Sequence, residues 1–186
     1  FPTRRSSDLF STIFQPQPHM VYPVKSFAAP SPTGRLGLFE FVRRSPRPDD
    51  VVIDVLFCGV CHSDLHSARN DWGHSKYPLV PGHEIIGRVL EVGSQVTRLR
   101  VGDHVGVGCM IDSCRTCASC GKGWEQYCES GFTATYGSTD PHDGSLTQGG
   151  YAETIVVSQE FVLKVPAGLD LAGAAPLLCA GITLWS

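Results

Sequence analysis

Four cysteines stand close together in the second half of the chain, at Cys114, Cys117, Cys120 and Cys128. Zinc binds four thiolates tetrahedrally at about 2.3 Å, and gaps of two residues let neighbouring thiolates reach one ion without strain. A shell of four protein ligands leaves no position for a substrate, so the spacing predicts a structural zinc. Such an ion would stabilise a polar, glycine-rich loop that cannot hold itself by burial.

The four-cysteine spacing also fits other kinds of site. An iron–sulfur cluster is bound by four thiolates as well, and cysteines can equally be free or paired in disulfides. Arg4 and Arg5 near the N-terminus are not followed by the apolar core of a signal peptide. Metal binding or catalysis is therefore favoured over a disulfide framework, and the alternatives stay open on spacing alone.

Further residues of metal-ligand type are scattered along the chain. Cys61 lies in GVCHSDLH (residues 59–66), His83 in PGHE (81–84) and Cys179 in LLCAGIT. A thiolate and an imidazole are both good zinc ligands, and the neighbouring glycines indicate turns from which a side chain can point inward. Taken singly, each of these residues is more often a buried cysteine or a hydrogen-bonded histidine.

The segments that must position these residues predict a mainly β domain. β-branched and apolar runs predict strands at residues 36–42, 51–57, 85–92, 101–107, 151–157 and 161–165. We expect one short helix at 61–70, with Ser63 as its N-cap, and another at 171–179 that runs into AGITLW. Short strands with little helix between them favour a β-barrel-like domain.

The composition excludes several classes of protein. The 186 residues are 42% hydrophobic and 18% charged, which is typical of a chain that buries a core. A net charge of −3 does not indicate nucleic acid or a membrane surface as a partner. No apolar run approaches the roughly 20 residues that span a bilayer. We therefore expect a cytoplasmic protein.

Five motifs together resemble one enzyme family over residues 25–186. The motifs CGVCHSDLH, YPLVPGHEIIGRV, VGDHVGVGCMIDSC, GGYAE and APLLCAGIT are similar to those of the zinc-containing medium-chain alcohol dehydrogenases, in particular the cinnamyl-alcohol-dehydrogenase-like, NADP-dependent aldehyde reductases. The resemblance implies a GroES-like β-barrel catalytic domain joined to a Rossmann domain. It also implies two Zn²⁺ per chain and a homodimer at full length. The implied reaction is hydride transfer between a small primary alcohol or aldehyde and NADP(H), or alternatively NAD(H).

The resemblance also assigns metal ligands. Four cysteines would hold the structural zinc: Cys114, Cys117, Cys120 and Cys128. Cys61, His83 and Cys179 would hold a catalytic zinc that keeps an open fourth position. Glu84 matches a residue that can enter the zinc shell when water leaves. A related sorbitol- or threonine-type dehydrogenase would usually have a Glu ligand in place of Cys179.

Four polar residues near Cys61 receive roles from the same resemblance. Ser63 matches the hydroxyl that hydrogen-bonds the reacting oxygen and passes its proton on, and His66 matches the solvent end of that relay. Asp64 matches the carboxylate that orients the His83 ring. His62 matches a position that faces the coenzyme pyrophosphate. Cys58 and Cys109 fall on no ligand position, and we expect both to be small core residues.

The expected domain organisation is uneven. Residues 1–22 predict an unpacked or artefactual tail, 23–168 the GroES-like catalytic domain, and 169–186 the start of a linker helix. No G-x-G-x-x-G occurs in the sequence, so we expect an N-terminal fragment that lacks its coenzyme domain and is inactive alone. The competing hypothesis is a non-enzymatic GroES-like zinc-binding module, which would need only the four-cysteine loop.

Overall fold

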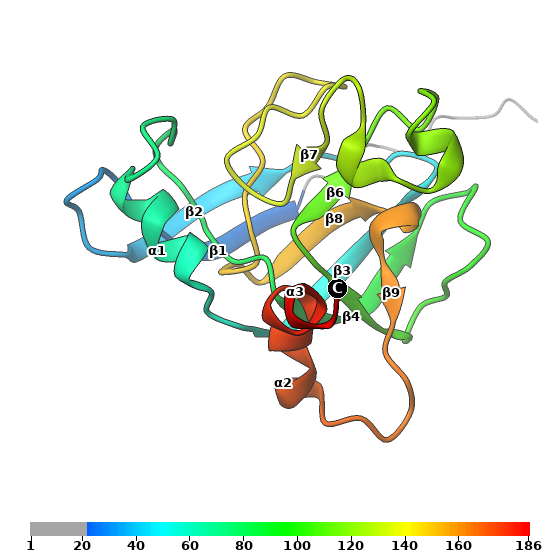
Figure 1. Cartoon of the computed structure of the whole chain (residues 1–186). Coiled ribbons are helices and arrows are strands. Elements are labelled where there is room, and N and C mark those ends of the chain that lie inside the picture. Colours follow the sequence, from blue (N-terminus) through cyan, green and yellow to red (C-terminus); the bar gives the residue numbers. More distant parts are fainter. Residues whose placement is uncertain (1–21) are drawn as a thin grey trace, which may run out of the picture.

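Nine β-strands form three antiparallel sheets in residues 22–186, the part of the chain that the computed structural model describes (Figure 1). The strands are β1 (Tyr22–Ala28), β2 (Gly37–Arg43), β3 (Asp50–Cys58), β4 (Ile85–Val92), β5 (His104–Val107), β6 (Met110–Asp112), β7 (Thr133–Ala134), β8 (Thr154–Ser158) and β9 (Leu163–Lys164). The prediction of a mainly β domain is confirmed. The predicted tail lies outside the described residues except for Tyr22, which begins β1.

The largest sheet has the strand order β8-β3-β4-β5-β9 and carries the main hydrophobic core. Its central strands are rich in β-branched residues, which pack well on a pleated surface. Val51 and Ile53 of β3, Ile85 of β4 and Val105 and Val107 of β5 are all fully buried. This rigid sheet fixes the ends of β3, β4 and β5, where the residues of the candidate sites begin.

The first sheet is a hairpin of β2, which we predicted at 36–42, and β1, which we did not predict. In β1 the buried side chains alternate with exposed ones, as a half-buried strand requires. One inward position is Ser26, whose hydroxyl donates a hydrogen bond to the carbonyl of Phe39 at 2.7 Å. A polar residue at a core position breaks the hydrophobic alternation, so the strand is less evident from sequence. The short strands β6 and β7 likewise carried no recognisable pattern.

Several strands are shorter than we predicted. The strand expected at 101–107 begins only at His104, because Gly102 adopts a φ of +92° in a turn. The strand expected at 151–157 begins at Thr154. The one expected at 161–165 shrinks to two residues, since Gln159–Phe161 forms a 3-10 turn, η3.

The helices are short and differ from the prediction at their ends. Helix α1 spans His62–Arg69 and is capped by Cys61, not by Ser63, because Asp64 reaches back to the Cys61 amide. The helix expected at 171–179 divides into α2 (Leu171–Ala174), the 3-10 turn η4 (Ala175–Leu178) and α3 (Ala180–Trp185). Pro176 within η4 has no amide hydrogen to donate to a continuous helix. Two further 3-10 turns, η1 (Cys120–Lys122) and η2 (Glu125–Tyr127), lie in the cysteine loop.

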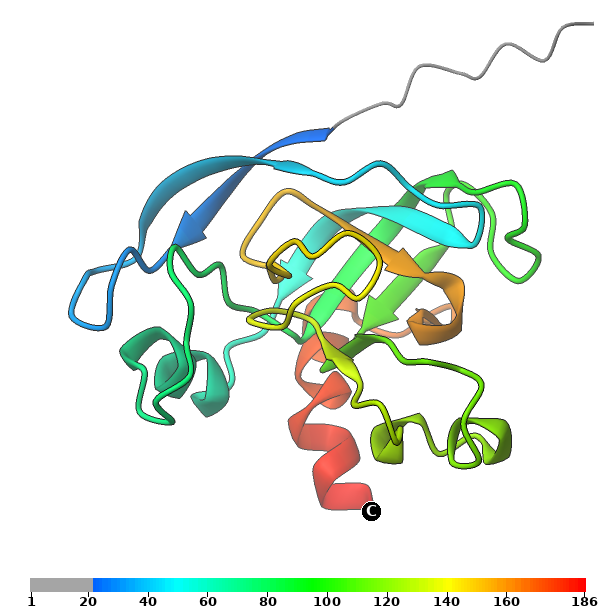
Figure 2. The same ribbon diagram turned by 90° about the horizontal axis from the view of Figure 1, so that it is seen from above.

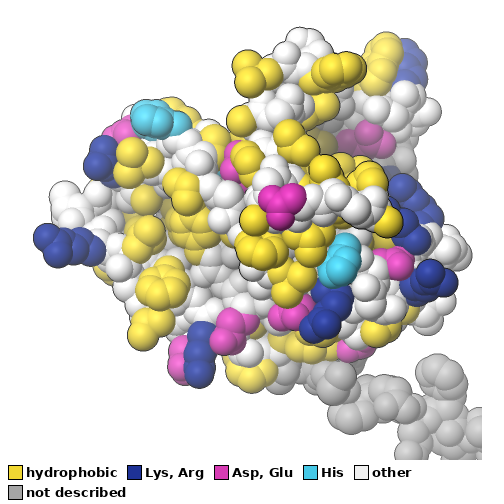
Figure 3. Space-filling model, turned by 90° about the horizontal axis from the view of Figure 1, so that it is seen from below, with side chains coloured by type: hydrophobic (Ala, Val, Ile, Leu, Met, Phe, Trp, Pro, Cys, Tyr) yellow, Lys and Arg dark blue, Asp and Glu magenta, His cyan; other side chains and the backbone are white. Residues whose placement is uncertain are grey.

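Helices α2 and α3 leave an apolar face open. Figure 2 shows α3 projecting from the sheet between α1 and the cysteine loop. Figure 3 shows hydrophobic side chains gathered on this side of the molecule. The exposed side chains include Leu177, Ile182, Leu184 and Trp185, the last of which is 87% exposed. No helix among the described residues is long and apolar enough to cross a membrane.

Candidate metal centres

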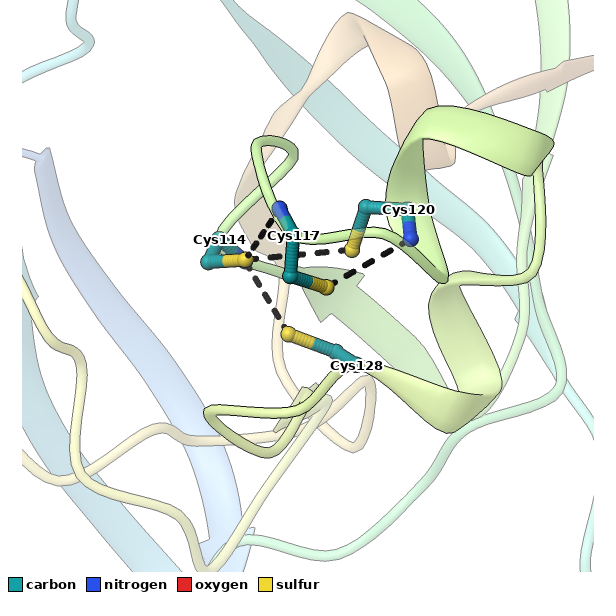
Figure 4. A group of neighbouring side chains, drawn as sticks. All are labelled: Cys114, Cys117, Cys120 and Cys128. Atoms are coloured by element: carbon teal, nitrogen blue, oxygen red, sulfur yellow. Dashed lines mark hydrogen bonds between the residues drawn. The ribbon is translucent and has the colours of Figure 1, made fainter.

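The four cysteines predicted to share an ion converge in one loop (Figure 4). Their sulfur atoms all lie within 4.8 Å of one another, and those of Cys114 and Cys120 are 3.9 Å apart. A disulfide would need about 2.05 Å. Thiolates placed tetrahedrally at 2.3 Å from one zinc ion are separated by about 3.8 Å. The spacing therefore fits a shared ion and not a disulfide.

Backbone amides of the loop point at the sulfur atoms. The amides of Cys117, Cys120 and Cys114 donate to the sulfurs of Cys114, Cys117 and Cys128, at 3.4, 3.5 and 3.5 Å respectively, and the Glu129 amide donates to the Cys117 sulfur at 3.5 Å. Hydrogen bonds of this kind favour the thiolate over the thiol. The amides of Thr116 and Cys117, in that order, lower the pKa of Cys114 to about 6. The four sulfur ligands are thus suited to binding a cation.

An arginine within the loop anchors it to the barrel. Arg115 lies between two of the cysteines and adopts a φ of +57°. Its guanidinium pairs with Asp49, ahead of β3, at 2.6 Å and with Asp112 of β6 at 3.3 Å. The Asp112 side chain is only 3% exposed, so this pair is shielded from solvent on one side. The loop is therefore fixed at its base by ion pairs and at its centre by the sulfur cluster.

A second group of ligand types forms from segments that are far apart in the sequence. Cys61, His83, Glu84 and Cys179 place one ligand atom each within 4.8 Å of the others. The sulfurs of Cys61 and Cys179 are 3.8 Å apart although 118 positions separate them. We call this set the mixed group. Cys61 follows β3, His83 and Glu84 precede β4, and Cys179 lies between η4 and α3. Whether these residues bind zinc stays a prediction.

Cys179 reaches the mixed group because Leu178 packs against β5. A Cβ at Gly106 would lie 3.1 Å from the Leu178 side chain, and one at Gly108 would lie 3.0 Å from the Leu178 carbonyl oxygen. The same side chain packs with Ile86 and Ala175 in a small core cluster. The absence of side chains at Gly106 of β5 and at Gly108 just beyond it thus allows the close approach that carries Cys179 to the site.

Asp64 organises the other ligands. Its carboxylate, in a residue only 3% exposed, accepts hydrogen bonds from the amides of Cys61 and Gly82 and lies 3.0 Å from Nδ1 of His83. The Tyr151 hydroxyl donates to it at 3.2 Å. With Nδ1 held by the carboxylate, Nε2 of His83 is the nitrogen left for a metal. The contact that the resemblance implies for Asp64 is therefore present.

Two glycines make room for the side chains of Cys58 and Glu84. Gly82 has a φ of +101°, which few other residues adopt, and its Cβ would lie 2.8 Å from the Cys58 sulfur. At Gly59 a Cβ would lie only 2.1 Å from a carboxylate oxygen of Glu84. Glu84 is 2% exposed and belongs to the mixed group. A side chain at Gly59 would displace it.

Burial and hydrogen bonds shift the pKa values of three ligands in the mixed group. Burial raises the pKa of the Cys61 thiol, but hydrogen bonds from Ser63, Cys179 and His83 outweigh burial and leave the pKa below its ordinary value. Burial raises the pKa of Cys179 to about 11, as expected for two neighbouring thiols of which one ionises first. Burial lowers the pKa of His83, but Asp64 and Cys109 raise it to about 12, so a metal ion must displace a proton from the ring in order to bind.

A cavity of about 310 Å³ opens onto one side of the mixed group. His83, Cys179 and Ser63 line it, together with the aromatic side chains of Trp72, Phe132 and Tyr136. The hydroxyl of Ser63 lies 3.6 Å from the Cys61 sulfur. A small molecule in this cavity would contact the ligands and the Ser63 hydroxyl together.

Two cysteines outside both metal groups behave differently. Cys58 is half-buried and packs against the main core, as we predicted, and burial raises its pKa to about 12. Cys109 is exposed and lines the cavity, so its prediction as a core residue was wrong. It follows Gly108, just beyond the end of β5, where the strand has already left the core. Sequence spacing carried no signal of this position.

The two histidines of α1 lie outside the cavity. Nδ1 of His66 is 2.7 Å from a carboxylate oxygen of Asp71, and its ring is tilted against Trp72 with centroids 5.3 Å apart. His62 is exposed. Neither residue is among those that line the cavity with Ser63. A relay from Ser63 to His66 would therefore have to pass through another group.

We expect the zinc-loaded chain to hold two zinc ions and to lose them at different rates. The four-thiol loop places all its ligands within fifteen residues, whereas the mixed group depends on the docking of Cys179 and faces a cavity through which a chelator can enter. Mild chelation, followed by metal analysis, should remove one equivalent first and leave the Cys114 loop loaded. A stoichiometry of one, or simultaneous loss of both ions, would contradict this assignment.

Comparison with known proteins places the geometry in context. The family model described as the alcohol dehydrogenase GroES-like domain matches residues 47–167. The chain is 55% identical over 163 residues to an NADP-dependent alcohol dehydrogenase C from Mycobacterium bovis, covering 88% of this chain and 47% of that protein. It is 53% identical over 160 residues to a probable cinnamyl alcohol dehydrogenase 8B from Oryza sativa, covering 86% of this chain and 36% of that protein.

The fold agrees with solved structures as well. A CAD from Helicobacter pylori, crystallised as a complex with NADP(H), superposes with a TM-score of 0.86 at 42% identity and covers 89% of this chain. This chain covers 48% of that one. The chain thus spans about half the length, or less, of the relatives it matches.

Proposed function

Because this chain belongs to the alcohol dehydrogenase GroES-like domain family, we propose that it forms the catalytic half of a zinc-dependent alcohol dehydrogenase. The reaction is hydride transfer between NADP(H) and a primary alcohol or its aldehyde. One observation carries the proposal: the mixed group of Cys61, His83, Glu84 and Cys179 borders a cavity instead of being closed off. A purely structural site would have no need of that opening.

The chain's own residues have separable tasks in this reaction. Cys61, His83 and Cys179 would hold a zinc ion, which would supply a Lewis acid beside the cavity. Asp64 holds the His83 ring in the orientation that presents Nε2. The Ser63 hydroxyl orients the substrate oxygen and exchanges a proton with it. The wall of Trp72, Phe132 and Tyr136 excludes water and suits an apolar or aromatic substrate.

Proton transfer to solvent completes the proposed reaction. His66 lies one helical turn beyond Ser63, and Asp71 fixes its ring at 2.7 Å. Because Ser63 and His66 do not contact each other directly, we propose that a water molecule bridges them. Glu84, the fourth member of the mixed group, would be available as a further metal ligand.

The proposed coenzyme is NADP(H), held by a second domain. The relatives support this choice, since one is named as NADP-dependent and another was crystallised with NADP(H). The exposed apolar face of α2 and α3 is suited to packing against a further domain. His62 is exposed, and we propose by resemblance that it meets the coenzyme pyrophosphate. By resemblance alone, we propose a homodimer, which light scattering of the longer protein would test.

The free thiols support a location in the cytoplasm. All eight cysteines are unpaired by disulfides in the described residues. Thiols and thiolate metal sites persist in reducing compartments. We propose that the protein acts there on small molecules, without a nucleic-acid or membrane partner.

A fusion protein tests the proposed function. The chain is joined to the remaining part of the Mycobacterium relative, and reduction of an aromatic or aliphatic aldehyde is followed by NADPH absorbance. We expect turnover from the fusion and none from the 186-residue chain alone, because hydride transfer requires the coenzyme in contact with the substrate. Zinc content and NADPH binding of the fusion establish that both halves are folded.

Within this fusion, His66→Ala should slow turnover by at most about 10²-fold, since water can still carry the proton. Ser63→Ala should cost more, because it removes the group that meets the substrate oxygen. Ser145→Ala serves as the control, since Ser145 is exposed and outside the cavity of Ser63. A folded fusion that is indifferent to Ser63→Ala would overturn the proposed relay, and a folded, coenzyme-binding fusion without turnover would overturn the function.

A further inference from the structure

Two histidines lie one helical turn apart on α1, outside both cysteine-containing groups. His62 and His66 are at positions i and i+4, which share one face of a helix. Their ring centroids are 5.0 Å apart and the rings are tilted by 48°. His62 is exposed, and the His66 side chain is 39% exposed. The pair is therefore accessible from solvent.

The ring geometry matches that of a chelate. Imidazole nitrogens bind zinc at about 2.0–2.1 Å, so two rings that share one ion at an angle near 100° have centroids roughly 5 Å apart. The observed separation of 5.0 Å agrees with this value. Positions i and i+4 of a helix already bring side chains this close, so α1 supplies the separation that a chelate needs.

Hydrogen bonding leaves the required nitrogens available. Nδ1 of His66 lies 2.7 Å from the Asp71 carboxylate, an arrangement that leaves Nε2 as the free nitrogen. His62 makes no side-chain hydrogen bond within residues 22–186. Trp72 packs on the other side of His66, with centroids 5.3 Å apart, and restricts its rotation. One ligand is thus held in place, and the other is free to close on an ion.

We propose that His62 and His66 form a third metal site, a two-histidine chelate for a divalent transition-metal ion that prefers imidazole, such as Ni²⁺ or excess Zn²⁺. Water fills the remaining coordination positions. Asp71 is a positioning residue for the site, through its contact with His66. The site is weaker than the two thiolate-containing groups because it offers two protein ligands.

An ion at this site would inhibit the enzyme. This consequence rests on the proposed function, in which His62 meets the coenzyme phosphate and His66 passes a proton to solvent. Both imidazoles are occupied when they hold a metal ion. The chelate itself does not depend on that function, so binding is measured separately from turnover.

Ni²⁺ titration of the zinc-loaded, 186-residue chain tests the site. Trp72 touches His66, and a bound transition-metal ion quenches a neighbouring indole, so tryptophan fluorescence reports occupancy. We expect saturable quenching without zinc release to an indicator dye. His62→Gln and His66→Gln should each raise the half-saturating Ni²⁺ concentration by well over tenfold. Asp71→Asn should raise it by about tenfold, the usual cost of losing an outer partner.

His74→Gln provides the matched control. His74 stacks on Trp72, the residue whose fluorescence is measured, with centroids 6.1 Å apart. It lies outside α1 and therefore does not share the helix face of His62 and His66. We expect its titration to equal that of the unchanged chain. Trp72→Phe should abolish the quenching while calorimetry still detects Ni²⁺ binding. Three results would each overturn the proposal. They are quenching in His62→Gln and His66→Gln equal to that of the unchanged chain, weaker quenching in His74→Gln, and quenching that accompanies zinc release.

Discussion

Replacing Cys61 with Ser is expected to lower aldehyde turnover of the fusion protein by about 10³-fold or more. A metal that polarises the substrate is worth several kcal/mol in the transition state, and each 1.36 kcal/mol changes the rate by about tenfold. Of the two thiols in the mixed group, Cys61 is the one whose pKa lies below its ordinary value, while that of Cys179 is raised. The zinc content of the 186-residue chain should fall from two ions to one.

Cys58→Ala is the control for this variant. Cys58 lies three residues away, at the end of β3, and belongs to neither metal group. Its loss should cost some stability, since it packs against the core, but should leave two zinc ions and most of the turnover. A Cys61→Ser protein that keeps two ions and normal turnover would remove Cys61 from the catalytic site.

The Cys114→Ser variant is expected to lose folding stability, because Cys114 belongs to the structural site and not to the site that borders the cavity. Removing a ligand from a closed site takes away metal-coupled folding free energy, on the order of several kcal/mol. For a chain of this size that lowers the unfolding temperature by on the order of 10 °C. The loop has little else to hold it beyond the ion pairs of Arg115, because Lys122, Trp124 and Tyr127 are exposed.

Ala118→Ser is the matched control for the loop. Ala118 is exposed between two of the cysteines and contributes no ligand, so the variant should keep two zinc ions and an unchanged melting curve. Differential scanning calorimetry with metal analysis measures both quantities. Unchanged thermal stability in Cys114→Ser would contradict the structural assignment.

Much of the fold could be predicted because it depends on local pattern. The runs at Val51 and Ile85 are β-branched and continuous, and they form the two central strands β3 and β4. The boundaries failed where a single residue changed the backbone. Gly102 turns the chain ahead of β5, and Pro176 interrupts the helix that was expected through Cys179. Ser26 concealed β1 because its inward hydroxyl is satisfied by a partner on another strand.

The grouping of Cys114 with its three partners was determined by the sequence itself. Thiolates two residues apart cannot lie far from one another, and the loop amides that support them belong to the same short segment. Local spacing therefore sufficed to indicate a shared ion, although the resemblance to a known family was needed to favour zinc.

The mixed group was decided by tertiary structure. Cys61 and Cys179 are 118 positions apart and meet only because Leu178 packs onto Gly106 of β5. Cys109, just beyond β5, lines the same cavity. The buried carboxylate of Asp64 accepts hydrogen bonds from donors in three separate segments. Such contacts arise from sheet register and core packing, which no local spacing encodes. From the residues alone, the sequence could therefore name the ligand types, while their convergence beside an open cavity depends on how the strands pack.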